Sequence, residues 1–134
     1  MPNTFPKHNL ETAPEKSKPL LRQLLEQSGP NGFYSVTAES PETLTAYAML
    51  HKAFMASSFT NEEKTVIWQT INVENQCHFC VPAHTYMAKA MKIDKAVSDA
   101  LRNETALPTA RLEALRDFTS VSYTHLTLPT TGIV

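Results

Sequence analysis

The feature that most constrains the fold is a polar capping residue in front of four separate apolar segments. The caps are Ser40, Thr60, Asp94 and Thr109. Ser40 is followed by Pro41, which suits the first turn of a helix, and Thr60 is followed by Glu63 at capping-box spacing. The segments behind these caps repeat their apolar residues at helical intervals and lack the strict alternation of strands. The sequence therefore predicts an all-α fold.

The expected elements follow from these caps and from the glycine and proline residues between them. We predict helices over residues 20–28, 41–57, 61–71, 77–91, 95–103 and 110–118. Residues 29–37 are expected to form a loop, with a weak strand signal at 33–36. Residues 1–13, which contain two prolines, are expected to form an extended N-terminal arm.

Length and composition favour one soluble globular domain. The chain has 134 residues, 42% of them hydrophobic, and a net charge of -1. Lysines and arginines are scattered rather than clustered, which argues against nucleic-acid binding. No apolar run approaches the roughly 20 residues of a membrane helix, and the N-terminus lacks the layout of a signal peptide. We expect a cytoplasmic protein whose helical domain spans residues 1–120.

The last fourteen residues, 121–134, differ in composition from the rest of the chain. They are rich in Thr and β-branched residues, contain Pro129 and Gly132, and have no helical period. This string also resembles translated sequencing adapter, so we interpret it as a non-native tail; a natural C-terminal strand is the alternative. On this interpretation the helical bundle is C-terminally truncated. We expect the truncation to expose an apolar strip that includes Leu112, Leu115 or Met91.

The residues that carry chemistry lie in the string ENQCHFCVPAH. Cys77 and Cys80 are three residues apart, and His84 follows Cys80 by four, so a helix that begins near Cys77 brings all three to one side. Helix N-terminal N–H groups and a neighbouring imidazole favour the thiolate, which is the form that attacks a peroxide or a disulfide. A second cysteine within reach can resolve the resulting sulfenic acid as a disulfide. This spacing predicts a redox-active pair.

These residues resemble the C-x-x-C-x-x-x-H signature of the alkylhydroperoxidase D and carboxymuconolactone decarboxylase family, and the likeness in helical layout extends over residues 10–119. The resemblance implies a helical bundle that assembles as trimers or hexamers. It implies a peroxidase that needs no bound cofactor and is reduced by an external dithiol. Cys80 would attack the hydroperoxide, Cys77 would resolve, and His84 would relay protons to a glutamate. The family's glutamate position corresponds to Thr65, so Glu62 or Glu74 would have to substitute.

Other interpretations of the same residues remain open. The cysteines could be inert buried thiols or half of a zinc site, for which only His8, His51 and His78 remain as further histidine ligands outside the tail at residues 121–134. His84 and Glu74 could be ordinary surface residues, and His51 falls on an apolar stripe as a core or interface histidine would. A lactone decarboxylase and a non-catalytic redox-sensing module are the alternative functions.

Overall fold

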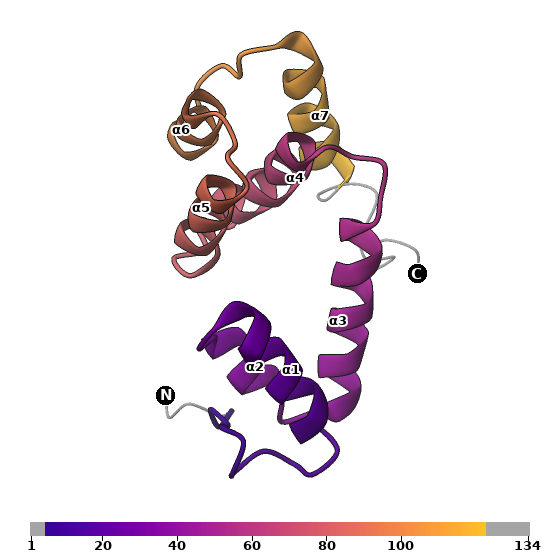
Figure 1. Ribbon diagram of the computed structural model, residues 1–134. Coiled ribbons are helices and arrows are strands. Elements are labelled where there is room, and N and C mark those ends of the chain that lie inside the picture. The colour runs from indigo at the N-terminus through magenta and orange to yellow at the C-terminus, as the bar shows by residue number, and fades with distance from the viewer. Residues whose placement is uncertain (1–4, 123–134) are drawn as a thin grey trace, which may run out of the picture. The chain divides into compact units, whose positions relative to one another are not determined.

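The computed structural model describes residues 5–122, and all of its regular structure is helical (Figure 1). The helices are α1 (Lys18–Ser28), α2 (Gly32–Thr37), α3 (Pro41–Met55), α4 (Asn61–Glu74), α5 (Cys80–Ala90), α6 (Lys95–Asn103) and α7 (Ala110–Val121). The predicted all-α class is confirmed, and the described residues contain no strand. None of the helices within residues 5–122 combines the length and the apolar character that a membrane span requires.

The chain divides into two compact units at residue 57, a division that the sequence analysis did not anticipate within its single domain. The first unit contains α1 to α3 and the second contains α4 to α7. Each unit has its own cluster of buried apolar side chains. The two units are therefore described separately.

The first unit has a small core that includes part of the expected N-terminal arm. Its buried apolar residues are Ala13, Leu21, Ala38 and Leu44. The prediction of an extended arm is wrong for the described residues, because Asn9 accepts hydrogen bonds from the backbone N–H groups of Glu11 and Thr12 and closes a turn. This turn brings Ala13 into the core. The local hydrogen bonds and the burial of Ala13 together stabilise this turn.

The segment predicted to be a loop, residues 29–37, instead contains the short helix α2. The side chain of Asn31 accepts a hydrogen bond from the N–H of Phe33 and caps this helix. The rings of Phe33 and Tyr34 then pack against Tyr47 of α3, with centroids 4.6 and 6.1 Å away. Aromatic packing and the cap therefore override the weak strand signal at residues 33–36.

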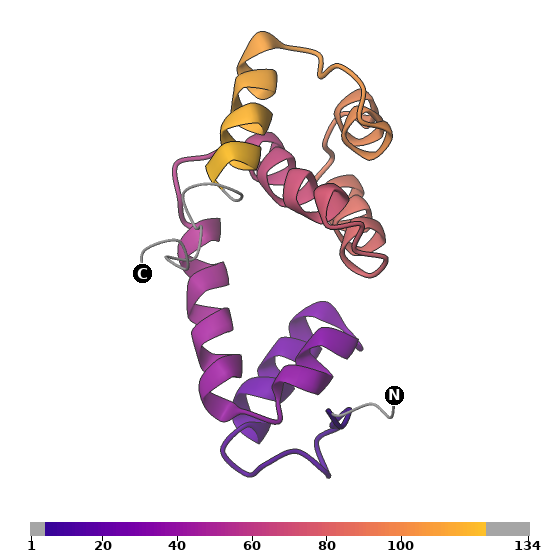
Figure 2. The ribbon, with the colours of Figure 1, turned by 180° about the vertical axis from the view of Figure 1, so that it is seen from behind.

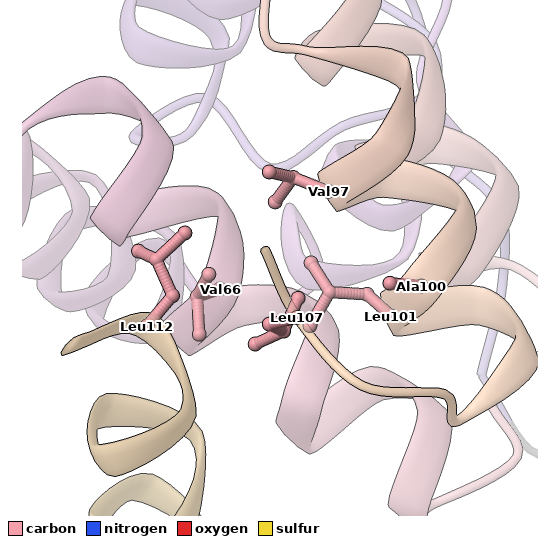
Figure 3. Close-up of a cluster of buried hydrophobic side chains, with 6 residues drawn as sticks. All are labelled: Val66, Val97, Ala100, Leu101, Leu107 and Leu112. Carbon is pink, nitrogen blue, oxygen red and sulfur yellow. The ribbon is translucent and has the colours of Figure 1, made fainter. Parts of the chain in front are cut away.

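The second unit is built around α4, against which α5, α6 and α7 pack (Figures 1 and 2). Figure 3 shows the buried apolar cluster that α4, α6 and α7 share with the segment before α7. Its members are Val66, Val97, Ala100, Leu101, Leu107 and Leu112. Burial of this cluster fixes α6 and α7 on α4 and leaves another face of α4 for α5.

All four caps predicted from the sequence are present. The side chains of Ser40, Asp94 and Thr109 accept N–H groups of the helices that they precede. Thr60 and Glu63 form both hydrogen bonds of a capping box, at 2.9 and 3.1 Å. These local bonds satisfy N–H groups that a helix start leaves without intrahelical partners, which explains why the helix starts were predictable.

Three connections in the second unit place a non-glycine residue in the left-handed region. Gln76, Lys92 and Glu104 have φ values of 49, 58 and 54° and follow the last turns of α4, α5 and α6. In each case the next residue donates its N–H to a carbonyl five residues earlier, as in a Schellman motif. The turn at Gln76 sets the position of Cys77.

Helix α7 lies at the end of the described part of the chain. The apolar strip exposed on it differs from the one that we expected. Leu112 is buried, with 4% of its surface exposed, and Leu115 packs against the same cluster. The exposed apolar residues of α7 are instead Phe118, at 64%, and Val121. Val121 is the last residue of the helix, and residues 123–134 of the predicted non-native tail lie outside the described residues.

Candidate thiol redox site

The end of α4 positions Cys77. After Glu74 the chain turns at Gln76, and the N–H of Cys77 donates to the carbonyl of Asn72 at 3.0 Å. The carbonyl of Cys77 then accepts the N–H of Val81 at 3.1 Å, which leads the chain into α5. Cys77 therefore lies between two helices, with both of its backbone groups bonded.

Cys77 and Cys80 form a disulfide, with Cα atoms 5.2 Å apart. The predicted bonding reach between the two sulfur atoms is confirmed. The helix predicted to begin at residue 77 begins instead at Cys80, so Cys77 lies three residues before α5. Both cysteines are half-buried, so exposure does not distinguish them. The pair is accessible enough for exchange with another thiol.

The backbone at the start of α5 provides a polar environment for the pair. The N–H of Cys80 donates to Sγ of Cys77 at 3.0 Å. In the reduced protein this bond and the positive end of the helix dipole would favour a thiolate on Cys77. Cys80 lies at the same helix end, one turn before His84 on α5.

His84 lies on α5, as predicted, and is half-buried against α4. Its ring packs on the indole of Trp68, with centroids 4.8 Å apart and planes inclined at 52°. The aromatic contact limits rotation of the imidazole about its side-chain bonds. Trp68 of α4 thus helps to hold the candidate base.

Gln69 links the redox segment to α4 and was not found by the sequence analysis. Its side chain is fully buried, and its amide N–H groups donate to the carbonyl of Val81 and to Oγ1 of Thr85, both at 3.1 Å. Its amide oxygen accepts a hydrogen bond from Asn72. A polar residue among the apolar positions Val66, Ile67 and Ile71 is the sequence signal that could have identified it. Gln69 thereby anchors the first turn of α5, where Cys80 lies.

The candidate relay carboxylates lie away from this network. Glu74 is exposed and lines a polar pocket of about 250 Å³ with Arg116 and Asp117 of α7. Glu62 lies in the first turn of α4, roughly 18 Å along that helix from Glu74 and at the end opposite the cysteines. Thr65, at the family's glutamate position, is buried and donates to the carbonyl of Asn61.

Glu63 is buried but has a structural role. Its carboxylate accepts the N–H of Thr60. It also pairs with Arg111 of α7, two of whose nitrogen atoms lie 2.6 and 2.7 Å from a carboxylate oxygen. The hydrogen bond from Thr60 and the guanidinium of Arg111 lower the pKa of Glu63. This carboxylate joins α7 to the start of α4.

The remaining histidines within residues 5–122 lie in separate environments. His8 contacts Glu39 at 2.5 Å, and His51 stacks on Tyr47, where burial lowers its pKa. His78 is exposed between the two cysteines. Within residues 5–122 no three His, Cys, Asp or Glu side chains converge as metal ligands would.

Comparisons with known proteins identified no relative of this chain. No protein-family model matches the sequence, and no curated protein matches it. The resemblance to the alkylhydroperoxidase D family therefore rests on the C-x-x-C-x-x-x-H motif and on the helical layout. The chemistry of the site has to be argued from its own residues.

Proposed function

We propose that the chain is a thiol-dependent peroxidase or disulfide oxidoreductase that uses Cys77 and Cys80. The observation that carries the proposal is the Cys77–Cys80 disulfide at the start of α5, with the His84 imidazole on the same helix. A half-buried pair that closes within one turn and receives a helix N–H has the features of a redox pair rather than of a structural staple. No bound cofactor is needed for this chemistry.

The proposed cycle has three steps. The thiolate of Cys80 attacks the terminal oxygen of a hydroperoxide, the O–O bond breaks, and a sulfenic acid and an alcohol form after the alkoxide takes a proton. The thiolate of Cys77 then attacks the sulfur of Cys80, and the disulfide forms as hydroxide leaves and is protonated to water. An external dithiol returns two electrons and two protons through a mixed disulfide.

His84 is the proposed proton carrier. It would accept the thiol proton of Cys80, which lies one helical turn away, and would return a proton to the leaving alkoxide. The packing of the imidazole on Trp68 supports this role by limiting its motion. Glu74 is the proposed acidic partner, and its exposed position beside α7 favours a smaller contribution than that of His84.

The exposed apolar side chains support assembly into a homo-oligomer, a trimer or hexamer by the family resemblance. Met49 and Leu50 of α3 have 68 and 70% of their surfaces exposed. Large apolar side chains next to one another on a surface often mark an interface. We also propose a cytoplasmic setting, where dithiol reductants can recycle the pair.

Substitution of the site residues tests the roles within the pair. Cys80→Ser should abolish peroxide consumption, and Cys77→Ser should allow one oxidation and leave a trappable sulfenic acid on Cys80. His84→Ala should slow turnover by roughly 10²–10⁴-fold. His78→Ala, an exposed histidine between the cysteines, is the matched control and should change the rate little.

Two outcomes would overturn parts of this proposal. If Cys80→Ser retains the first turnover and Cys77→Ser loses it, the N–H bond to Cys77 decides the nucleophile and the two roles are exchanged. If neither wild type nor variants turn over a hydroperoxide with a dithiol, the enzyme proposal fails. Consumption of a lactone would then identify a decarboxylase, and reversible oxidation without turnover would identify a redox sensor.

A further inference from the structure

A groove between α5 and α6 is an unassigned feature of the second unit. It has a volume of about 650 Å³, within the roughly 300–1,000 Å³ of small-molecule sites. Its apolar surface comes from Val81, Pro82, Tyr86 and Ile93. Tyr86 has 75% of its surface exposed, an unusual state for an aromatic residue on a helix that packs against its neighbours. The apolar lining indicates that a ligand here has an apolar portion.

The charged residues around the groove are mostly basic. Lys89, Lys95 and Arg102 line it together with a single acidic residue, Asp99. Lys95 forms an ion pair with Asp99, whereas Lys89 and Arg102 form no ion pair within residues 5–122. The groove therefore has two cations whose charge the described residues do not neutralise. An anionic group is the complementary ligand.

We propose that this groove binds an amphipathic carboxylate, with its alkyl chain on the apolar residues and its carboxylate beside Lys89 and Arg102. The volume and the single-unit origin of all the lining residues favour a small molecule over a protein segment. Val81 and Lys89 are eight residues apart on α5, which corresponds to roughly 12 Å along the helix. A medium-length alkyl chain spans this distance.

The position of the groove suggests a link to the redox pair. Val81 and Pro82 follow Cys80 directly in the sequence, so the groove begins at the helix end that bears the disulfide. If the proposed peroxidase function holds, hydroperoxides of amphipathic carboxylates are its preferred substrate class. Binding itself does not depend on that function, because it requires neither peroxide nor free thiols.

Calorimetric titration of the oxidised full chain with dodecanoate, below its micellar concentration, tests the binding. We expect saturable binding, about tenfold weaker for each two methylenes removed from the chain. Lys89→Glu and Arg102→Glu should each weaken binding about tenfold or more. Lys16→Glu, an exposed charge reversal in the first unit, is the matched control and should leave binding unchanged.

Dodecylamine, which has the same chain with a cationic head, keeps the test decisive if a variant fails to fold. It should bind wild type at least tenfold more weakly than dodecanoate does. Absence of saturable dodecanoate binding, or equal binding of the two amphiphiles, would overturn the proposal. Loss of binding in Lys16→Glu as large as in Lys89→Glu would do the same. A wild-type oligomer that buries Tyr86 would assign the groove to a second copy instead.

A kinetic comparison separates this inference from the proposed function. Lys89→Glu should raise the KM for a long-chain hydroperoxy carboxylate about tenfold and leave that for tert-butyl hydroperoxide unchanged. Turnover of neither peroxide by wild type contradicts the peroxidase, while carboxylate binding still stands. If wild type turns over both peroxides and Lys89→Glu changes the two KM values equally, only the assignment of the substrate class is contradicted.

Discussion

Helices α3 and α4 are nearly equal in length, 15 and 14 residues, but differ in what they bury. In α3 only Leu44 is buried, and apolar side chains such as Met49 and Leu50 face solvent. The buried residues of α4 are Glu63, Lys64, Thr65, Val66, Gln69 and Thr70. Five of these six are polar or charged, so specific polar contacts hold α4 in addition to the apolar cluster around Val66.

This difference has a consequence for chemistry. A buried polar group must keep its partner, because a lost partner costs roughly 1–3 kcal/mol. The partners of α4 lie on α5 and α7, through Gln69 and Glu63 respectively. Such bonds hold α5 in one orientation, which a redox pair and its base require. Exposed apolar residues on α3 impose no such geometry and are suited to association.

Truncation of one leucine in each core is the largest test of this comparison. Leu112→Ala and Leu44→Ala should each destabilise their own unit by about 2–5 kcal/mol, because each leaves a cavity in a buried cluster. Amide hydrogen exchange should show lost protection in α4 to α7 for the first variant and in α1 to α3 for the second. Equal loss of protection over both units in either variant would mean that they unfold as one, and the comparison would break.

Removal of the buried amide sharpens the role of α4. Gln69→Leu should lower the free energy of unfolding by about 1–3 kcal/mol, because it removes two donors that bind α5. It should also slow disulfide formation, since the first turn of α5 loses its anchor. Chemical denaturation and thiol oxidation rates measure both effects. Gln27→Leu on the exposed face of α1 is the control, and an equal loss there would contradict the assignment.

The carboxylate of Glu63 makes the second unit sensitive to acid. Its lowered folded-state pKa means that its contribution to stability is complete above the ordinary value near 4.5 and is lost as the pH falls through the lower, folded value. Glu63→Gln should therefore reduce the loss of stability between pH 6 and pH 3. Denaturant midpoints at both pH values measure it. Glu42→Gln, in the first turn of α3, should change this difference less; an equal change would contradict the account.

Substitutions at the helix ends should have effects of opposite sign in the two units. Gly29 has φ 73° and ψ -170°, a region nearly restricted to glycine, so Gly29→Ala should cost about 1–3 kcal/mol. Gln76→Gly removes the strain of a non-glycine residue in the left-handed region but adds conformational freedom to the unfolded chain. We expect the free energy of unfolding to rise by about 0.5 kcal/mol. Thermal unfolding measures both. A loss of stability in Gln76→Gly would show that the Gln76 side chain makes stabilising contacts.

Local signals made much of the second unit predictable. Thr60, Asp94 and Thr109 bond to N–H groups two or three residues away, so their roles depend only on nearby sequence. The same holds for the cysteine spacing, which fixes the distance between Cys77 and Cys80 once a helical turn forms. These expectations required no knowledge of distant contacts.

Expectations failed where distant contacts decide the structure. Helix α2 depends on packing of Phe33 and Tyr34 against Tyr47, and the buried state of Ala13 depends on α1 and α3. Gln69 meets α5 across 12 residues of sequence, and Glu63 meets Arg111 across 48. Sequence periodicity indicates which face of a helix is buried but not which residue it meets there. The residues that position the site were therefore missed.

The central claim is that Cys77 and Cys80 are a redox pair, and thiol mapping of the peroxide-treated wild type tests it most directly. The full chain would be reduced, freed of reductant, exposed to one equivalent of hydrogen peroxide, alkylated and mapped by peptide mass spectrometry. Both cysteines should be alkylated before treatment, and afterwards they should be recovered as one Cys77–Cys80 disulfide that has lost two hydrogen atoms. Full alkylation after peroxide, or separate over-oxidation of each cysteine without a disulfide, would contradict the account.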